Sequence, residues 1–241
     1  QLRDEDYDGA IKTCKRILRY LPRKDKVRAE TLGYIGTSYA MKKAFEDSYQ
    51  AFDQALQIDP DDAYLWYNFS LACTHTSRTG KALPALERAA ALEADGEMAE
   101  QFAENLAMLQ KITQSELALR GPDFSLDQLI EQQELFQQGL QLTSKGQWEK
   151  SEAIYRDAIA LGDCLPQPWG NLGICLLMQK RFDEAEAAYQ CALEIDPEYE
   201  LAKTHLENLP HLRANPDFEP EFRVNAPFAD SNTTLTIIDE E

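Results

Sequence analysis

Histidine and cysteine, the side chains that most readily do chemistry, are few in this chain and poorly spaced for a reaction. The three histidines are His75, His205 and His211. Cys73 lies near His75 in sequence, but residues two apart on a helix point to different sides. They therefore form neither a metal site nor the adjacent pair that a cysteine nucleophile needs. The glycines are too scattered for a phosphate-binding loop. The chain is predicted not to be an enzyme and to hold no metal and no cofactor.

The elements that would position any functional surface recur along the chain at a fixed interval. Gly139 and Tyr155 reappear one interval later as Gly173 and Tyr189. This period of about 34 residues lies within the range of about 20 to 50 that is typical of stacked supersecondary units. Such arrays mostly work by presenting an extended surface to another molecule. The period therefore predicts a protein whose function is binding.

Each unit is predicted to be a pair of antiparallel helices. Apolar residues recur at i, i+3, i+4 and i+7, stop at a polar turn midway, and then resume. The turn falls at residues 179–181 in one unit and at 144–147 in the unit before it. Gly139 and Gly173 lie inside a helix, where glycine costs roughly 1 kcal/mol relative to alanine. We therefore expect a second helix to approach closely at these glycines.

Four units carry a pattern that resembles the tetratricopeptide repeat family. They span residues 29–62, 63–96, 132–165 and 166–199. The signature is nearly complete in the last unit, where its residues are Trp169, Leu172, Gly173, Ala185, Tyr189, Ala192 and Pro197. The resemblance implies an all-α fold, an alpha-alpha superhelix in which antiparallel helix pairs form a solenoid. It also implies a protein-interaction scaffold.

The segments outside the four units are assigned by comparison with them. Residues 1–28 resemble the second helix of a truncated repeat followed by a basic loop, which suggests a fragment of a longer protein. Residues 97–131 are a degenerate linker of one long helix and a loop, which either continues one bent array or acts as a hinge. Residues 200–213 are predicted to be a capping helix, and residues 214–241 an extended, non-helical acidic tail.

Local signals mark the ends of these segments. Gly121-Pro122 is expected to break the long helix, and Ser125 with Gln128 resembles a capping box that opens the next one. The helical pattern is expected to stop after Pro210. The tail fits a disordered linker, the first strand of a truncated domain, or a segment that folds back on the array, and the sequence does not select among them.

The charge of the chain favours some partners over others. The net charge of −18 argues against generic nucleic-acid binding, which depends on basic residues that neutralise phosphates. No segment approaches the roughly 20 apolar residues of a membrane-spanning helix. Residues 1–28 nevertheless carry nine basic and five acidic residues, which either meet an acidic partner or form a solvated face. The basic residues concerned include Lys12, Lys15, Arg16, Arg19, Arg23, Lys24, Lys26 and Arg28.

The cysteines indicate a structural role. Cys14, Cys73, Cys175 and Cys191 occupy helical positions that carry small or apolar residues in other units, which predicts buried free thiols. The odd count of five and the absence of CxxC pairs favour a reducing compartment. The expected location is cytoplasmic.

The predicted binding surface follows from the resemblance, because the first helices of tetratricopeptide repeats line a concave groove. Half of the candidates are alternatively explained by packing between neighbouring units. Thr37, Met41, Gln133 and Gln167 accompany a core set of twelve groove candidates. These are Tyr34, Tyr64, Tyr67, Asn68, Leu71 and His75 in the first arm, and Phe136, Gln137, Leu140, Asn171, Ile174 and Met178 in the second.

The composition of this set predicts a neutral, partly apolar peptide or helix of a partner protein as the ligand. One subtype of the family captures C-terminal carboxylates with lysine and arginine, but Glu30, Tyr64 and Gln137 stand where such a clamp would have basic residues. The alternative function is a regulatory or docking arm of a larger multidomain protein whose catalytic or signalling domain lies elsewhere. Nothing in the sequence fixes the oligomeric state.

Overall fold

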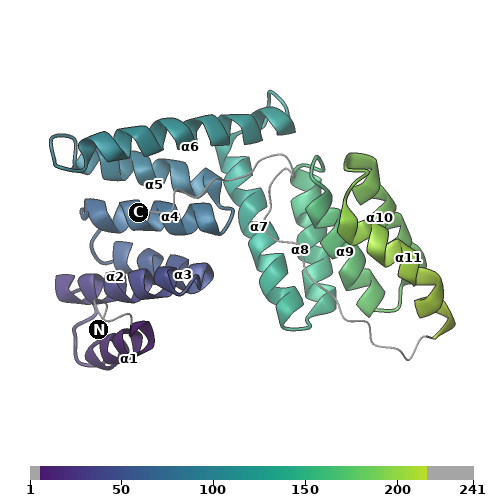
Figure 1. Ribbon diagram of the computed structural model, residues 1–241, viewed down its shortest axis with the longest axis horizontal. Coiled ribbons are helices and arrows are strands. Elements are labelled where there is room, and N and C mark those ends of the chain that lie inside the picture. Colours follow the sequence, from purple (N-terminus) through teal and green to yellow (C-terminus); the bar gives the residue numbers. More distant parts are fainter. Residues whose placement is uncertain (1–5, 216–241) are drawn as a thin grey trace. The chain divides into compact units, whose positions relative to one another are not determined.

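The computed structural model describes residues 6–215, and within this range the chain forms eleven helices and no strand (Figure 1). The helices pack into two compact units that divide between Ala118 and Leu119. This division lies inside the segment 97–131 that the sequence set apart as a linker. Most of the predicted tail, residues 216–241, lies outside the described residues.

Unit 1 contains two pairs in which a first helix contacts the second helix that follows it, together with one further helix at each end. Its elements are α1 (Tyr7–Ile17), α2 (Lys26–Met41), α3 (Phe45–Leu56), α4 (Ala63–His75), α5 (Thr79–Leu92) and α6 (Ala99–Arg120), which crosses the boundary between the units. The pairs α2–α3 and α4–α5 fall within the predicted units 29–62 and 63–96, apart from the first turn of α2. Within unit 1, α2 and α4 lie side by side (Figure 1).

Unit 2 repeats this arrangement. Its elements are α7 (Leu126–Ser144), α8 (Trp148–Leu161), α9 (Pro166–Met178), α10 (Phe182–Ile195) and α11 (Glu200–Ala214). The chain is thus an all-α protein of helix pairs, as its repeats predict. The predicted capping box is present, because Ser125 Oγ accepts from Gln128 N at 3.2 Å and Gln128 Oε1 accepts from Ser125 N at 2.9 Å.

Three helix pairs are held by a glycine that lies against an aromatic ring. An ideal Cβ placed on Gly36 would lie 2.8 Å from the Phe52 ring, and one on Gly139 would lie 2.5 Å from Tyr155. At Gly173 the distance to Tyr189 Cε1 would be 2.4 Å. Such separations are far inside van der Waals contact, so the first and second helices approach as closely as they do because the glycine has no side chain. The expectation of close approach at Gly139 and Gly173 is confirmed.

The turn between the two helices of a unit has one geometry in all four units. Lys43, Ser77, Gly146 and Lys180 have φ between 56° and 66°. The next backbone N–H bonds the carbonyl five residues back, as in Arg181 N to Leu176 O at 3.0 Å. This pattern is the Schellman motif, which satisfies the last carbonyls of a helix. Three of these positions have no glycine, so the surrounding contacts hold the chain in a conformation that is unfavourable for most residues.

An arginine beside this turn joins one helix pair to the previous one. Arg78 is 2% exposed and donates to Glu46 of α3 at 2.7 Å, with its guanidinium 4.1 Å from the centre of the Tyr49 ring. In unit 2, Arg181 follows the same turn and donates to Glu152 of α8 at 2.5 Å. Burial alone would raise the pKa of Glu152, but hydrogen bonds from Gln179, Arg156 and Arg181 outweigh it and lower the pKa.

Several boundaries and burials differ from the sequence expectation. Helix α11 continues through Pro210 to Ala214, since a proline there loses only the hydrogen bond that its own nitrogen would donate and the chain is near the end of the helix. Cys73 and Cys175 are buried free thiols as predicted, but Cys14 and Cys191 are only partly buried.

Replacing Gly173 with alanine is expected to destabilise unit 2, although alanine is the better helix former. The new Cβ would meet Tyr189, and overpacking of this kind costs about 1–3 kcal/mol. The unit 63–96 carries Ser70 and Leu86 at these two positions, and both are buried. We therefore expect Gly173→Ala to cost clearly less in a Tyr189→Leu background. Chemical denaturation of the four proteins of this cycle measures the coupling, and additive effects would contradict a direct contact.

Candidate functional site

Several large apolar side chains of unit 1 are exposed on its first helices, α2 and α4. Tyr34 and Met41 of α2 are 56% and 58% exposed, and Tyr64 and Leu71 of α4 are 59% and 37% exposed. Asn68 and His75 are partly buried. Five of the six groove candidates of the first arm therefore have accessible surface, whereas the sixth, Tyr67, is buried at 7% exposure. We call Tyr34, Met41, Tyr64 and Leu71 the α2–α4 apolar surface.

The repeat sets the spacing of this surface. Tyr34 and Asn68 are one repeat period apart, as are Met41 and His75. Within each helix the positions are seven residues apart, which is close to two turns and keeps them on one face. Side chains of two adjacent helices thus form two parallel rows in which an aromatic or apolar group stands beside a polar one.

The partly buried candidates next to this surface, His75 and Asn68, are held by contacts within unit 1. The His75 ring stacks on Phe45 at 4.1 Å between ring centres with an interplanar angle of 2°. Asn68 Nδ2 donates to its own helix at Tyr64 O, at 2.8 Å, which leaves Oδ1 as the group that can accept from a ligand. Phe45 was not among the sequence candidates, because its place at the start of a second helix gives no sign that it contacts His75.

Tyr67 lies behind the surface rather than in it. Its ring stacks on Phe102 of α6 at 4.7 Å. Its hydroxyl accepts from Asn105 at 3.2 Å and from Gln101 at 3.4 Å. The tyrosine therefore joins α4 to α6. It is one of the candidates that packing between neighbouring helices explains.

The candidates of the second arm divide in the same way. Phe136, Asn171 and Ile174 are 0% exposed, and the Phe136 ring packs at 5.8 Å from Tyr155. Their burial does not support contact with a partner. Gln137, Leu140 and Met178 are partly exposed. Asn68 and Asn171 hold the same position in their units yet differ in burial, so the repeat position alone does not decide whether a side chain is accessible.

Buried hydroxyl groups lie behind the candidates of unit 2. Thr143 Oγ1 and Ser151 Oγ are 2.5 Å apart, and each lies 2.8 Å from Gly139 O. Burial raises the pKa of Tyr155, whose hydroxyl lies 3.4 Å from Thr143 Oγ1, and burial likewise raises the pKa of the Cys175 thiol. Since both groups stay protonated at neutral pH, this cluster is suited to packing and not to nucleophilic chemistry.

Two searches of the described residues bear on other classes of site. No group of three or more histidine, cysteine, aspartate or glutamate side chains between residues 6 and 215 is arranged to hold a metal ion. None of the helices in that range is long and apolar enough to cross a membrane.

The comparisons with known proteins identify the class of repeat. The profile of the tetratricopeptide repeat matches residues 166–199, the unit formed by α9 and α10. The unit formed by α9 and α10 is therefore identified as a tetratricopeptide repeat. No curated protein matches the sequence.

Three solved structures resemble the chain at low sequence identity and low TM-score. The structure of MamA is 20% identical over 81% of this chain and 92% of its own, with a TM-score of 0.35. The TPR2AB domain of yeast Sti1 in its pHSP90 complex is 16% identical over 87% and 79%, with a TM-score of 0.39. Cut9 with Hcn1 is 17% identical over 88% and 44%, with a TM-score of 0.32.

The environment of His75 predicts a dependence of stability on pH. Burial lowers the pKa of His75 below its ordinary value of 6.5, so the unfolded chain takes up a proton at a higher pH than the folded one. The contribution to stability is complete above the unfolded pKa and is lost as pH falls through that value towards the folded pKa. His75→Phe keeps a ring against Phe45 and removes the titration.

Thermal melts of both proteins between about pH 7.5 and pH 5 measure this effect, since histidine changes charge in that range. We expect the melting temperature of the wild type to fall more steeply than that of His75→Phe, because the carboxylates are common to both. Parallel curves would show that His75 is equally easy to protonate in both states.

Proposed function

We propose that this chain is a protein-interaction scaffold that binds a peptide or helical segment of a partner protein on the α2–α4 apolar surface. The observation that carries the proposal is the exposure of Tyr34, Met41, Tyr64 and Leu71, each at least 37% exposed, on two adjacent helices. Water contact of large apolar side chains is unfavourable by about 25 cal/mol per Å². Large apolar side chains that are exposed on adjacent helices favour an interaction site.

The chemistry of the surface favours a neutral, partly apolar ligand. Tyrosine and methionine are enriched at protein interfaces, tyrosine for its rigid amphipathic ring and methionine for its adaptability. Burial lowers the pKa of His75, so the imidazole adds no positive charge at neutral pH. Asn68 Oδ1 can accept a hydrogen bond from the backbone of a ligand. A C-terminal carboxylate would find no basic residue among these groups.

A selection of peptides tests the proposal. A phage-displayed library panned on the wild-type chain is expected to enrich sequences with apolar anchors. These peptides should bind Tyr34→Ser/Met41→Ser/Tyr64→Ser more than tenfold more weakly, since aromatic anchors at interfaces are commonly worth about 2 kcal/mol or more. Isothermal titration calorimetry measures both affinities. The three replaced side chains are exposed, so their loss should change stability by roughly 0.5 kcal/mol or less.

A control variant replaces the same residue types by serine outside the α2–α4 apolar surface. Tyr20→Ser/Met108→Ser removes a tyrosine that is 83% exposed and a methionine that is 40% exposed, neither of them on the α2–α4 apolar surface. It should bind the selected peptides like the wild type. If no peptide is enriched, or if both variants lose affinity equally, this surface is not the binding site.

A further inference from the structure

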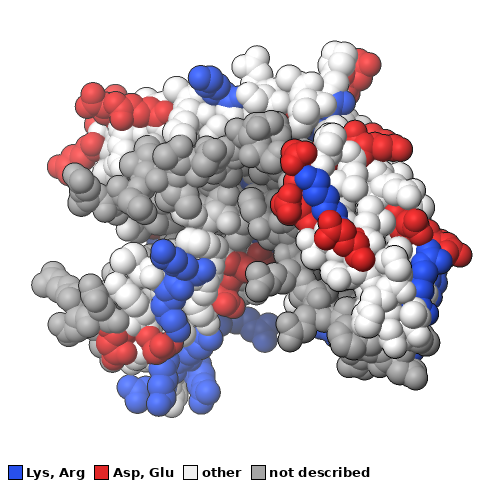
Figure 2. Space-filling view, turned by 45° about the vertical axis from the view of Figure 1, so that its right-hand side comes forward, with Lys and Arg blue, Asp and Glu red and all other residues white. Residues whose placement is uncertain are grey.

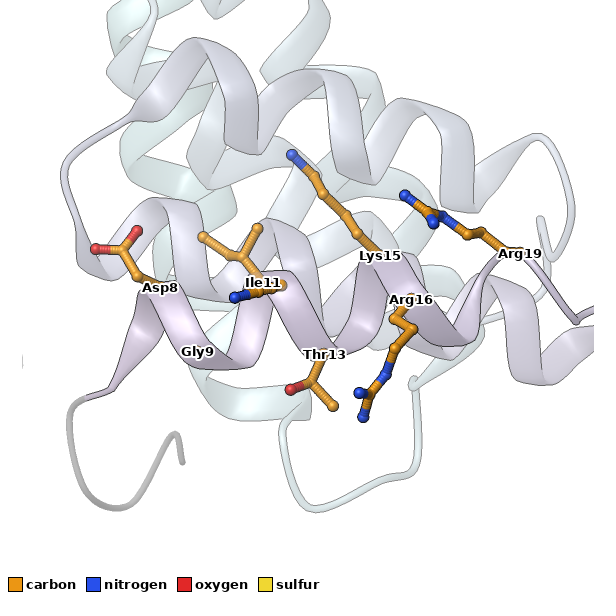
Figure 3. Close-up of a pocket in the computed structure, with 8 residues that line it drawn as sticks. Asp8, Gly9, Ile11, Thr13, Lys15, Arg16 and Arg19 are labelled. Atoms are coloured by element: carbon orange, nitrogen blue, oxygen red, sulfur yellow. The ribbon is translucent and has the colours of Figure 1, made fainter.

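The outer face of α1 carries a cluster of cations in a chain that is otherwise strongly acidic. Lys12, Lys15, Arg16 and Arg19 are exposed and line a hollow of about 630 Å³, together with Asp8, Gly9, Ile11 and Thr13 (Figure 3). Lys15 extends towards α2, where its Nζ donates to Tyr39 Oη at 2.7 Å, and Arg16 points away from α2 (Figure 3). Figure 2 shows lysine and arginine gathered over this end of unit 1.

Most of these cations have no anionic partner. Within residues 6–215, Lys12, Arg16, Arg19, Arg23 and Lys24 make no ion pair. Exposed arginines of other helices do find partners. Arg213 of α11, for example, donates to Asp183 and to Glu186 of α10 at 2.6 Å each. The charge of the α1 cluster is therefore available to a ligand. We call Lys12, Arg16 and Arg19 the α1 basic face.

Comparison with α3, a second helix that has a neighbouring helix on each side, shows that the positions of the basic face point outwards. Aligning α1 with α3 places the basic face on Gln50, Gln54 and Gln57, all of which are exposed. The same alignment places Cys14 and Ile17 on Phe52 and Ala55, which are 1% and 0% exposed. The basic face is therefore distinct from the face with which a second helix packs in its array.

Exposed apolar groups lie near the cations at the end of α1. Ile17, the last residue of the helix, is 42% exposed, and Tyr20, three residues further on, is 83% exposed. A site that combines guanidinium groups with apolar surface offers a ligand both charge pairing and area to bury. The hollow of about 630 Å³ is open to solvent, and it offers more room than a single inorganic anion needs.

We propose that the α1 basic face docks an acidic segment of a partner protein in which carboxylates alternate with apolar residues. Charge complementarity supports this ligand, since arginine pairs with carboxylates through two parallel hydrogen bonds. The extent of the face supports it as well. Helix α1 has 11 residues and is therefore about 16 Å long, which an extended segment of about five residues covers.

A nucleic acid fits this face less well. Its phosphates continue beyond a patch of this length, at one charge per roughly 1.7 Å of duplex, and would next meet the rest of a chain whose net charge is −18. A short acidic segment stays on the patch, because charges separated by more than about 8 Å are largely screened at physiological salt. This surface is separate from the α2–α4 apolar surface, so either proposal can fail without the other.

The test uses a fluorescent peptide in which glutamate alternates with leucine and measures its anisotropy on titration with the full chain. We expect saturable binding that weakens as salt rises. Lys12→Glu/Arg16→Glu/Arg19→Glu should reduce the affinity about tenfold or more, on the basis of roughly 0.5 kcal/mol or more for each lost pair. A peptide with glutamine in place of glutamate should bind as weakly as that variant does. The melting temperature of the variant should match that of the wild type.

The control variant Lys111→Glu/Lys145→Glu/Lys150→Glu makes the same change in net charge at three exposed lysines outside the α1 basic face. It should retain the wild-type affinity within about twofold. The proposal is overturned if both variants lose affinity equally, if the glutamine peptide binds as well as the glutamate peptide, or if the wild type does not bind at low salt. It is also overturned if an oligonucleotide of equal charge displaces the peptide more effectively than unlabelled peptide does.

Discussion

The close approach of glycine to an aromatic ring is the contact on which the rest of this structure depends. Gly36, Gly139 and Gly173 each leave room for a ring of the following helix, at distances that no Cβ would permit. The ring in turn fills the space between the two helices, and Phe52, Tyr155 and Tyr189 are at most 1% exposed. This contact recurs with the repeat. Each of these helix pairs therefore buries the same helix faces and leaves the same helix faces exposed.

The chemistry of the exposed helix faces depends on residues that do not take part in this packing. On α2 and α4 these positions hold Tyr34, Met41, Tyr64 and Leu71, all at least 37% exposed. On α1 they hold lysine and arginine, where α3 has glutamines. A single helix-pair geometry thus presents an apolar surface and a basic surface within unit 1. These two surfaces suit partners of different chemistry. Salt weakens electrostatic binding to the basic surface but does not screen binding to the apolar surface.

Polar contacts also connect one helix pair to the next. Arg78 is buried and is satisfied by the Glu46 carboxylate and by the face of Tyr49. Arg181 takes the corresponding place in unit 2, where it binds Glu152 and Glu184. A buried charge that lost its partner would be strongly destabilising. This cost applies to Arg78, whose side chain is 2% exposed, whereas the Arg181 side chain is 36% exposed and its ion pairs are weakened by water.

The sequence by itself determined the helix pairs, their turns and the close approach at Gly139 and Gly173, because these depend on residue types at fixed spacing within a single repeat. It also located the basic stretch around Lys12. Only the tertiary structure decided which predicted groove residues are accessible. Asn68 and Asn171 are equivalent by sequence, yet one is partly exposed and the other is fully buried. The physical reason is that exposure depends on the side chains that neighbouring elements bring to a position, and a local pattern does not report them.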